Sequence, residues 1–200
     1  MKKITIILAA SGVIVAGAML ACNTAEKPSG NKEGLNEAAA PLSNDSLIKR
    51  GQYLVHIMGC NDCHTPLIMT AQGPARDTSR LLSGHPAGMQ LPPADAEHTK
   101  GWILTSMSGT AVTGPWGTSF AANITSDETG IGNWSEAQFI KSIREGKLKG
   151  MDNTRPLLPP MPWQGYAKAT DEDLKAIFAY LKSTKPIENR VPAPVPPQSL

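Results

Sequence analysis

The most constraining feature of this sequence is the pentapeptide Cys60-Asn61-Asp62-Cys63-His64. Two thiols separated by two residues can form thioether bonds to the vinyl groups of haem, and a histidine directly after the second cysteine can bind the iron. A porphyrin attached in this way is larger than any side chain, so the fold must form around it. The pattern therefore predicts one covalently attached haem c, held by Cys60 and Cys63, with His64 as an iron ligand.

Two other interpretations of the cysteine pair are weaker. A thioredoxin-type redox couple would lie in a βαβ unit, whereas the flanking segments here have helical and loop patterns. A structural zinc site would need two more ligands at suitable spacing, and the one other cysteine, Cys22, lies in the N-terminal targeting region. Haem attachment is therefore the favoured interpretation.

The N-terminus has the pattern of an export signal. A short basic start, Met1-Lys2-Lys3, precedes an apolar run over residues 4–20. The sequence Met19-Leu20-Ala21-Cys22 resembles a bacterial lipoprotein cleavage box, which predicts removal of residues 1–21 and a lipid on Cys22. Cleavage without lipid and an uncleaved signal anchor are the alternatives. All three place the remaining chain on the periplasmic side of a bacterial membrane.

Shifts in composition divide the rest of the chain into three parts. Residues 22–44 are polar and lack a periodic apolar face, so we expect a flexible tether. Residues 45–185 form the predicted monohaem domain. Residues 186–200 contain five prolines and are expected to form an extended tail, lying on the domain surface or projecting from it. Without residues 1–21 the chain has 17 basic and 17 acidic residues, so nucleic acid is not an expected partner.

Three helices dominate the predicted domain, which we assign to a mainly α fold. The first covers residues 46–58 and leads into the haem motif, with apolar residues at helical spacing. The second begins at Ser135, which forms a capping-box pattern with Gln138, and ends at Gly146. The third begins at Thr170 and carries acids in its first turn, where the helix dipole favours negative charge.

The segment between the haem motif and the second helix is unusually long. Residues 65–122 are dense in Gly, Pro and Thr, and we interpret them as an insertion because compact domains rarely contain so long a connection. Within this insertion, residues 102–107 and 110–113 flank Ser108-Gly109 and are expected to form a short β-hairpin.

A haem iron that carries electrons needs a second axial ligand, and Met161 is the leading candidate among eight methionines. It lies in Pro159-Pro160-Met161-Pro162, where the prolines restrict the backbone and remove amide donors. A thioether is a weak ligand, so it binds well when the chain holds it in place beforehand. His85, in the insertion, is the second candidate.

The order of these features resembles the class I cytochrome c fold. The resemblance rests on a helix ending in the haem motif, a Met-Pro in a proline-rich loop, and the closing helical sequence around Asp173-Leu174 and Tyr180-Leu181. It implies that the first and last helices cross near Gly51 and Tyr180. Residues 122–134, which contain Asn-Ile-Thr-Ser-Asp and Thr-Gly-Ile-Gly-Asn-Trp, are similar to the cytochrome subunits of bacterial membrane alcohol and sugar dehydrogenases and to related monohaem and dihaem periplasmic cytochromes.

These features favour a membrane-tethered electron carrier and not an enzyme. Its expected partners are redox proteins such as a dehydrogenase, an oxidase or another cytochrome. A fixed electron-transfer subunit of a dehydrogenase complex is one alternative, and a five-coordinate haem sensor or peroxidase is another. Basic residues also outnumber acids over 141–155, which fits either a solvated helix face or a docking patch for an acidic partner. These basic residues are Lys141, Arg144, Lys147, Lys149 and Arg155.

Overall fold

A computed structural model describes residues 43–92 and 99–197 of the chain. The predicted signal peptide (1–21), the lipidation site Cys22 and nearly all of the predicted tether (22–44) lie outside the described residues. Within the two described stretches, none of the helices combines the length and apolar character needed to cross a membrane.

The first and last helices cross in close contact, as the sequence resemblance implied. Helix α1 (Asn44–Ile57) and helix α6 (Asp171–Ser183) correspond to the predicted first and third helices, and Ser43 and Thr170 cap their N-termini. At the crossing, a Cβ built on Gly51 would lie 1.9 Å from the backbone oxygen of Ala176 and 2.8 Å from Cβ of Tyr180. The absence of a side chain at Gly51 therefore sets the distance between the two helices.

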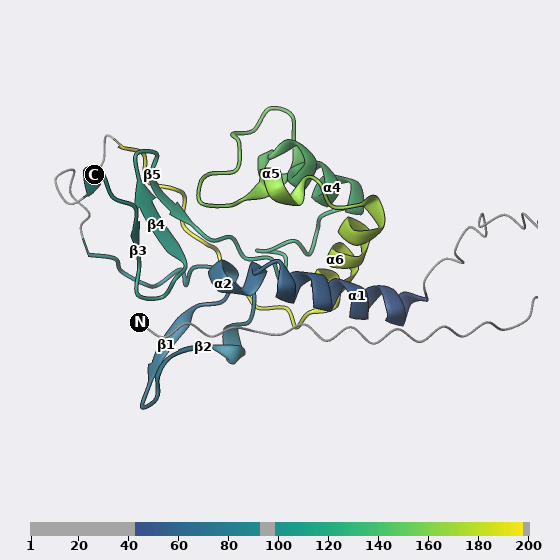
Figure 1. Cartoon of the computed structure of the whole chain (residues 1–200), viewed down its shortest axis with the longest axis horizontal. Helices are drawn as coiled ribbons and strands as arrows, with labels where there is room; N and C mark the ends of the chain where they lie inside the picture. Colours follow the sequence, from purple (N-terminus) through teal and green to yellow (C-terminus); the bar gives the residue numbers. More distant parts are fainter. Residues whose placement is uncertain (1–42, 93–98, 198–200) are drawn as a thin grey trace, which may run out of the picture. The chain divides into compact units, whose positions relative to one another are not determined.

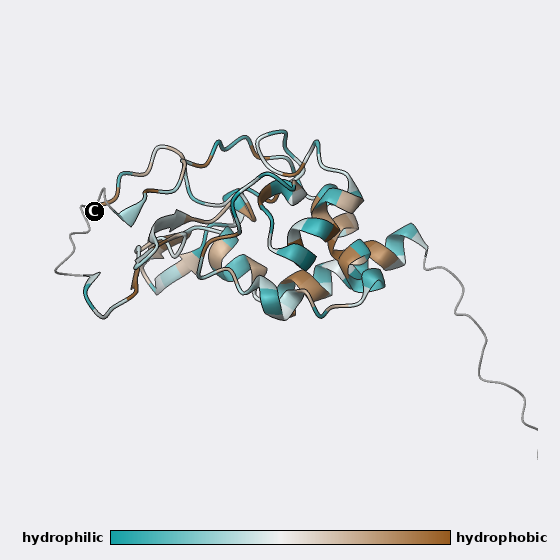
Figure 2. Cartoon of the chain, turned by 90° about the horizontal axis from the view of Figure 1, so that it is seen from above, coloured by the Kyte–Doolittle hydropathy of each residue, from teal (hydrophilic) through white to brown (hydrophobic). Residues whose placement is uncertain are grey.

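Helix α4 (Glu136–Glu145) is the third of the longer helices and packs against α6. Ser135 and Gln138 form the predicted capping box, and Gly146 ends the helix in the left-handed conformation. The rings of Phe139 on α4 and Phe178 on α6 have centroids 5.4 Å apart. The helices in Figure 2 each carry hydrophobic and hydrophilic turns, as expected for elements around a shared core. The core consists of Leu54, Val55, Leu82, Ile131, Phe139, Leu174, Ala176, Ile177 and Leu181.

Two small antiparallel sheets form within residues 65–122. The first is a hairpin of β1 (Leu67–Thr70) and β2 (Gly73–Arg76), and the second has the order β3 (Leu104–Thr105), β4 (Ala111–Gly114) and β5 (Gly117–Phe120). Figure 1 shows the three-stranded sheet at the end of the domain opposite α4 and α6. The fold thus combines helices with small antiparallel strands.

The predicted hairpin around Ser108-Gly109 forms with shorter strands, because only Leu104 and Thr105 of residues 102–107 pair with β4. The hairpin of β1 and β2, and strand β5, were not predicted. Strand β1 is a run of three apolar residues followed by a threonine, and β5 consists mainly of small and hydroxyl-bearing residues. Neither sequence has the alternation of apolar and polar residues that marks a strand.

The C-terminal segment is attached to the domain at several described points, among them Ile187, Asn189 and Val195. The Asn189 side chain is 4% exposed and donates hydrogen bonds to the backbone oxygens of Ser83 and His85. Further along, Val195 exchanges two backbone hydrogen bonds with Thr118 on β5. In Figure 1 this yellow segment runs from the end of α6 back to β5. The prolines predicted an extended segment, but no sequence pattern indicated these buried polar contacts.

We expect Gly51→Ala to destabilise the protein by about 3 kcal/mol or more, because the new methyl group collides with the backbone of α6. Gly88→Ala is the matched control, since nothing lies within 4 Å of a Cβ at that position. Urea unfolding of the haem-loaded variants measures both effects. Equal midpoints for the two variants would contradict the close crossing.

Candidate haem site

The haem motif forms a short helix of its own. Helix α2 (Cys60–His64) follows Gly59, which has the left-handed φ of 70° and separates this helix from α1. In a helix, positions i, i+3 and i+4 lie on one face, so Cys60, Cys63 and His64 share a side of α2. Both cysteines are free thiols, Cys60 partly buried and Cys63 exposed. The residues predicted to attach haem are therefore placed together.

The orientation of the His64 ring suits iron binding. Its Nδ1 lies 2.7 Å from the backbone oxygen of Ala122, and because a carbonyl can only accept, Nδ1 carries the proton. Burial lowers the pKa of His64, and the hydrogen bond to Ala122 offsets this in part. The ring is thus a neutral imidazole whose Nε2 keeps its lone pair, which is the form that binds a metal.

The thiols of the motif do not resemble a redox couple. Burial raises the pKa of Cys60 to about 11. The pKa of Cys63 is also raised, mainly because the thiol is partly buried and to a smaller extent because the Asp62 carboxylate is nearby. A thioredoxin-type couple needs the opposite shift, because the thiolate is the reactive form. Across residues 43–92 and 99–197, no group of three or more His, Cys, Asp or Glu side chains could hold a metal ion such as zinc.

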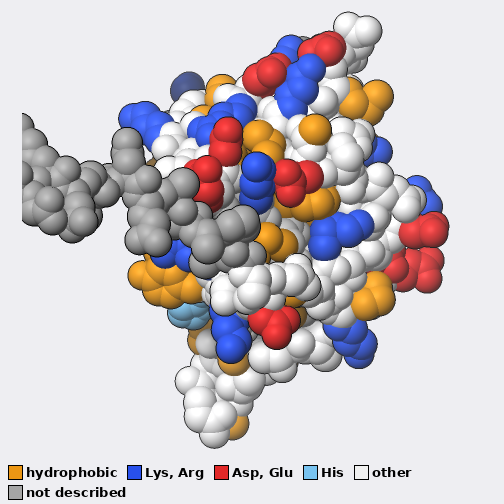
Figure 3. Space-filling model, turned by 90° about the vertical axis from the view of Figure 1, so that its right-hand side faces the viewer, with side chains coloured by type: hydrophobic (Ala, Val, Ile, Leu, Met, Phe, Trp, Pro, Cys, Tyr) orange, Lys and Arg blue, Asp and Glu red, His pale blue; other side chains and the backbone are white. Residues whose placement is uncertain are grey.

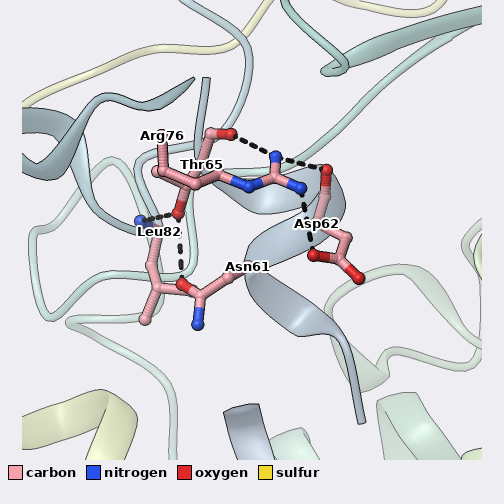
Figure 4. A network of polar contacts seen from close by, with 5 residues as sticks. All are labelled: Asn61, Asp62, Thr65, Arg76 and Leu82. Atoms are coloured by element: carbon pink, nitrogen blue, oxygen red, sulfur yellow. Dashed lines mark hydrogen bonds and ion pairs between the residues drawn. The ribbon is translucent and has the colours of Figure 1, made fainter. Parts of the chain in front are cut away.

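Arg76 on β2 holds helix α2 from outside (Figure 4). Its guanidinium donates to the backbone oxygens of Asp62 at 2.7 Å and Thr65 at 3.1 Å, and to the Asp62 carboxylate at 3.0 Å. The Thr65 hydroxyl in turn donates to the side chain of Asn61 and accepts from the amide of Leu82. The hairpin of β1 and β2 therefore fixes both the haem motif and the chain that leaves it.

The loop that contains Met161 is attached on both sides. Before it, the amide of Leu157 donates to the oxygen of Gly146 at 2.7 Å, and the Ser119 hydroxyl donates to the oxygen of Pro159 at 2.6 Å. After it, the short helix α5 (Trp163–Tyr166) carries Tyr166, whose hydroxyl donates to the oxygen of Met58 at 2.6 Å. Met58 ends α1 just before the haem motif, so Tyr166 links the Met161 loop to the entrance of α2.

Tyr166 and Ser119 were missed by the sequence analysis. Burial is the largest cause that raises the pKa of Tyr166, so its hydroxyl stays protonated and remains a donor to Met58. No local pattern marks either residue, since each acts on a backbone oxygen far away in the sequence.

His85, the second candidate ligand, packs beside the three-stranded sheet. The side chain is completely buried, with its Nδ1 2.9 Å from the Thr110 hydroxyl and its ring centroid 4.7 Å from that of Phe120. Burial lowers the pKa of His85, so the ring is neutral and packs as part of the insertion. The other ring nitrogen, Nε2, is buried and has no hydrogen-bond partner among the described residues, so His85 stays the second candidate ligand after Met161.

The residues at this site fit a haem, because α2 presents two thiols and an imidazole whose other nitrogen is already satisfied. The sequence model described as Cytochrome c matches residues 48–185 of the chain. The chain belongs to the cytochrome c family. Membership implies covalently bound haem c, which agrees with the cofactor predicted from the motif.

Several curated proteins resemble this cytochrome. It is 34% identical over 139 residues to the gluconate 2-dehydrogenase cytochrome c subunit of Pantoea cypripedii, covering 69% of this chain and 23% of that protein. It is 31% identical over 144 residues to the fructose dehydrogenase cytochrome subunit of Gluconobacter japonicus, covering 70% of this chain and 22% of that protein.

A third relative is the cytochrome c subunit of the quinone alcohol dehydrogenase from Gluconobacter oxydans. The identity is 28% over 159 residues, covering 78% of this chain and 26% of that protein. The chain therefore spans about a quarter of the length of these relatives. The predicted resemblance to dehydrogenase cytochrome subunits is confirmed.

We expect Arg76→Gln to lower the free energy of unfolding by about 1–2 kcal/mol, because two backbone oxygens at the haem motif lose a charged donor. Asp62→Asn is the matched control. It removes only the exposed ion pair and leaves the backbone contacts, so its expected cost is below about 1 kcal/mol. Urea unfolding measures both variants, and an equal loss in the two would show that the backbone contacts contribute nothing.

Proposed function

We propose that this cytochrome is a monohaem electron-transfer protein in which Cys60 and Cys63 attach the haem and His64 and Met161 bind its iron. Bound haem iron supplies one-electron chemistry by changing between the ferric and ferrous states. The observation that carries the proposal is the His64 ring, whose Nδ1 donates to Ala122 and leaves Nε2 for the metal. The single Cys-x-x-Cys-His pentapeptide in the sequence supports one haem.

The chain's own residues would set the properties of the site. A neutral imidazole held by a backbone oxygen keeps one orientation, and a thioether held by a proline-rich loop is a soft ligand that favours the ferrous iron. The anchored loop on either side of Met161 supports this assignment. With both axial positions occupied, the function is electron transfer and no substrate bond needs to change.

Replacing Met161 tests the proposal against a five-coordinate sensor or peroxidase. For Met161→Ala we expect loss of the sulfur-to-iron charge-transfer band in the oxidised protein, a lower reduction potential, and rapid carbon monoxide binding after reduction. Met107→Ala is the control, because Met107 is 82% exposed and should leave the spectrum unchanged. An unchanged spectrum in Met161→Ala would show that another residue holds the iron.

We also propose that the mature protein is anchored by a lipid on Cys22 and acts on the periplasmic side of a bacterial membrane. The basic and apolar N-terminus and the sequence Leu20-Ala21-Cys22 support this placement. Residues 23–44 would then act as a tether that lets the haem domain reach its partners.

The anchor is tested by Cys22→Ser. We expect the wild-type cytochrome in the membrane fraction of the producing cells, with an acylated Cys22 in its N-terminal peptide. The variant should lack the acyl group and shift to the soluble periplasmic fraction. Mass spectrometry and fractionation measure the two, and a wild-type N-terminal peptide without lipid would contradict the proposal.

A second candidate function is that of a fixed subunit in a dehydrogenase complex. The similarity to proteins named as cytochrome c subunits of gluconate and alcohol dehydrogenases favours it. In that case a dehydrogenase would copurify with the cytochrome in constant ratio from gently solubilised membranes. A freely exchanging monomer favours the mobile carrier instead.

A further inference from the structure

The Ser119 hydroxyl connects the three-stranded sheet with the Met161 loop. Ser119 lies on β5, is 8% exposed, and has its oxygen 2.6 Å from the oxygen of Pro159 and 3.2 Å from that of Val112. A hydroxyl has one hydrogen, and the shorter contact assigns it to Pro159. The indole nitrogen of Trp116 donates to the same hydroxyl oxygen at 3.4 Å, so this oxygen also accepts a hydrogen bond.

The loop has few other polar attachments. Its three prolines, 159, 160 and 162, have no amide hydrogen to donate. Within it, the amide of Met161 donates to the oxygen of Leu158 at 3.2 Å. Among the residues that the structure describes, Ser119 makes the only side-chain hydrogen bond to residues 158–162.

A shift of the backbone at Pro159 is transmitted to Met161, because only Pro160 lies between them and its ring restricts the backbone torsions. The part-buried hydrogen bond from Ser119 to Pro159 therefore fixes the loop relative to β5. The same strand is followed closely by Ala122, which accepts the hydrogen bond from His64. Residues 119–122 thus contact the His64 ring through Ala122 and the Met161 loop through Ser119.

We propose that Ser119 is a positioning residue for Met161, holding the thioether in place as the axial ligand of the iron. This inference rests on the proposed function, in which Met161 binds that iron. Ser119 acts through the oxygen of Pro159. Loss of the Ser119 hydroxyl should raise the fraction of protein in which the Met161 loop has released the iron, although Met161 itself is still present.

The test is a titration of the oxidised, haem-loaded protein with imidazole, which competes with the thioether for iron. If the loss of this one part-buried hydrogen bond weakens the loop position by about 1 kcal/mol, the released fraction rises about five- to tenfold. For Ser119→Ala we expect the apparent imidazole Kd to fall by the same factor, with a weaker sulfur-to-iron band at elevated temperature. Absorbance spectroscopy measures both quantities.

Thr113→Val is the matched control. Thr113 and Thr118 share a buried hydroxyl hydrogen bond of 2.8 Å in the same sheet, and its removal destabilises the sheet without touching Pro159. We expect this variant to lose thermal stability but keep the wild-type imidazole Kd. An equal change of Kd in Ser119→Ala and Thr113→Val, or an unchanged Kd in Ser119→Ala, overturns the inference.

The isosteric pair Ser119→Thr and Ser119→Val gives a second measurement, because both side chains have the same shape and only one has a hydroxyl. We expect Ser119→Val to bind imidazole about five- to tenfold more tightly than Ser119→Thr. Equal affinities overturn the inference even if the alanine variant does not load haem. A wild-type protein without the sulfur band would overturn Met161 ligation itself, which separates failure of the proposed function from failure of this inference alone.

Discussion

The haem motif lies on a helix too short to be stable alone, and this constraint explains much of the surrounding structure. Helix α2 has five residues, whereas isolated helices need roughly 12–15 residues to be even marginally stable in water. Its position must therefore come from contacts with other elements. Arg76 donates a hydrogen bond to the backbone of α2, and the backbone oxygen of Ala122 accepts one from the His64 ring. Tyr166 donates to the oxygen of Met58, at the end of α1 just before the motif.

Those contacts give residues 65–122 a structural purpose. The first hairpin brings Arg76 to α2, and the second sheet ends in β5, close to Ala122 and carrying Ser119. The C-terminal segment supports that sheet in turn, because Val195 pairs with Thr118 on β5. Residues 65–122 therefore contact the His64 ring directly, through Ala122, and the Met161 loop at Pro159, through Ser119.

Local sequence patterns were sufficient to predict helices α1, α4 and α6, but not the short helices α2 and α5. Ser135 and Gln138 cap α4 through bonds between neighbours in the chain, and the close approach at Gly51 follows from the family resemblance. The supporting contacts could not be predicted in this way. Arg76, Ser119 and Asn189 each bond to backbone oxygens on other elements, and a backbone oxygen has no signature in the sequence. Strand β5 was missed for a related reason, since its small residues pack without apolar alternation.

Ion pairs neutralise two of the five basic residues in segment 141–155. Figure 3 shows basic and acidic side chains interleaved on the face turned to the viewer. Within the basic segment 141–155, Lys141 pairs with Asp152, and Arg144 pairs with Asp171 at the start of α6. Pairs of this kind cancel most of the field beyond a Debye length, which is about 8 Å at physiological ionic strength. Steering of a partner over a distance needs an unbalanced charge, and these two ion pairs remove it at Lys141 and Arg144.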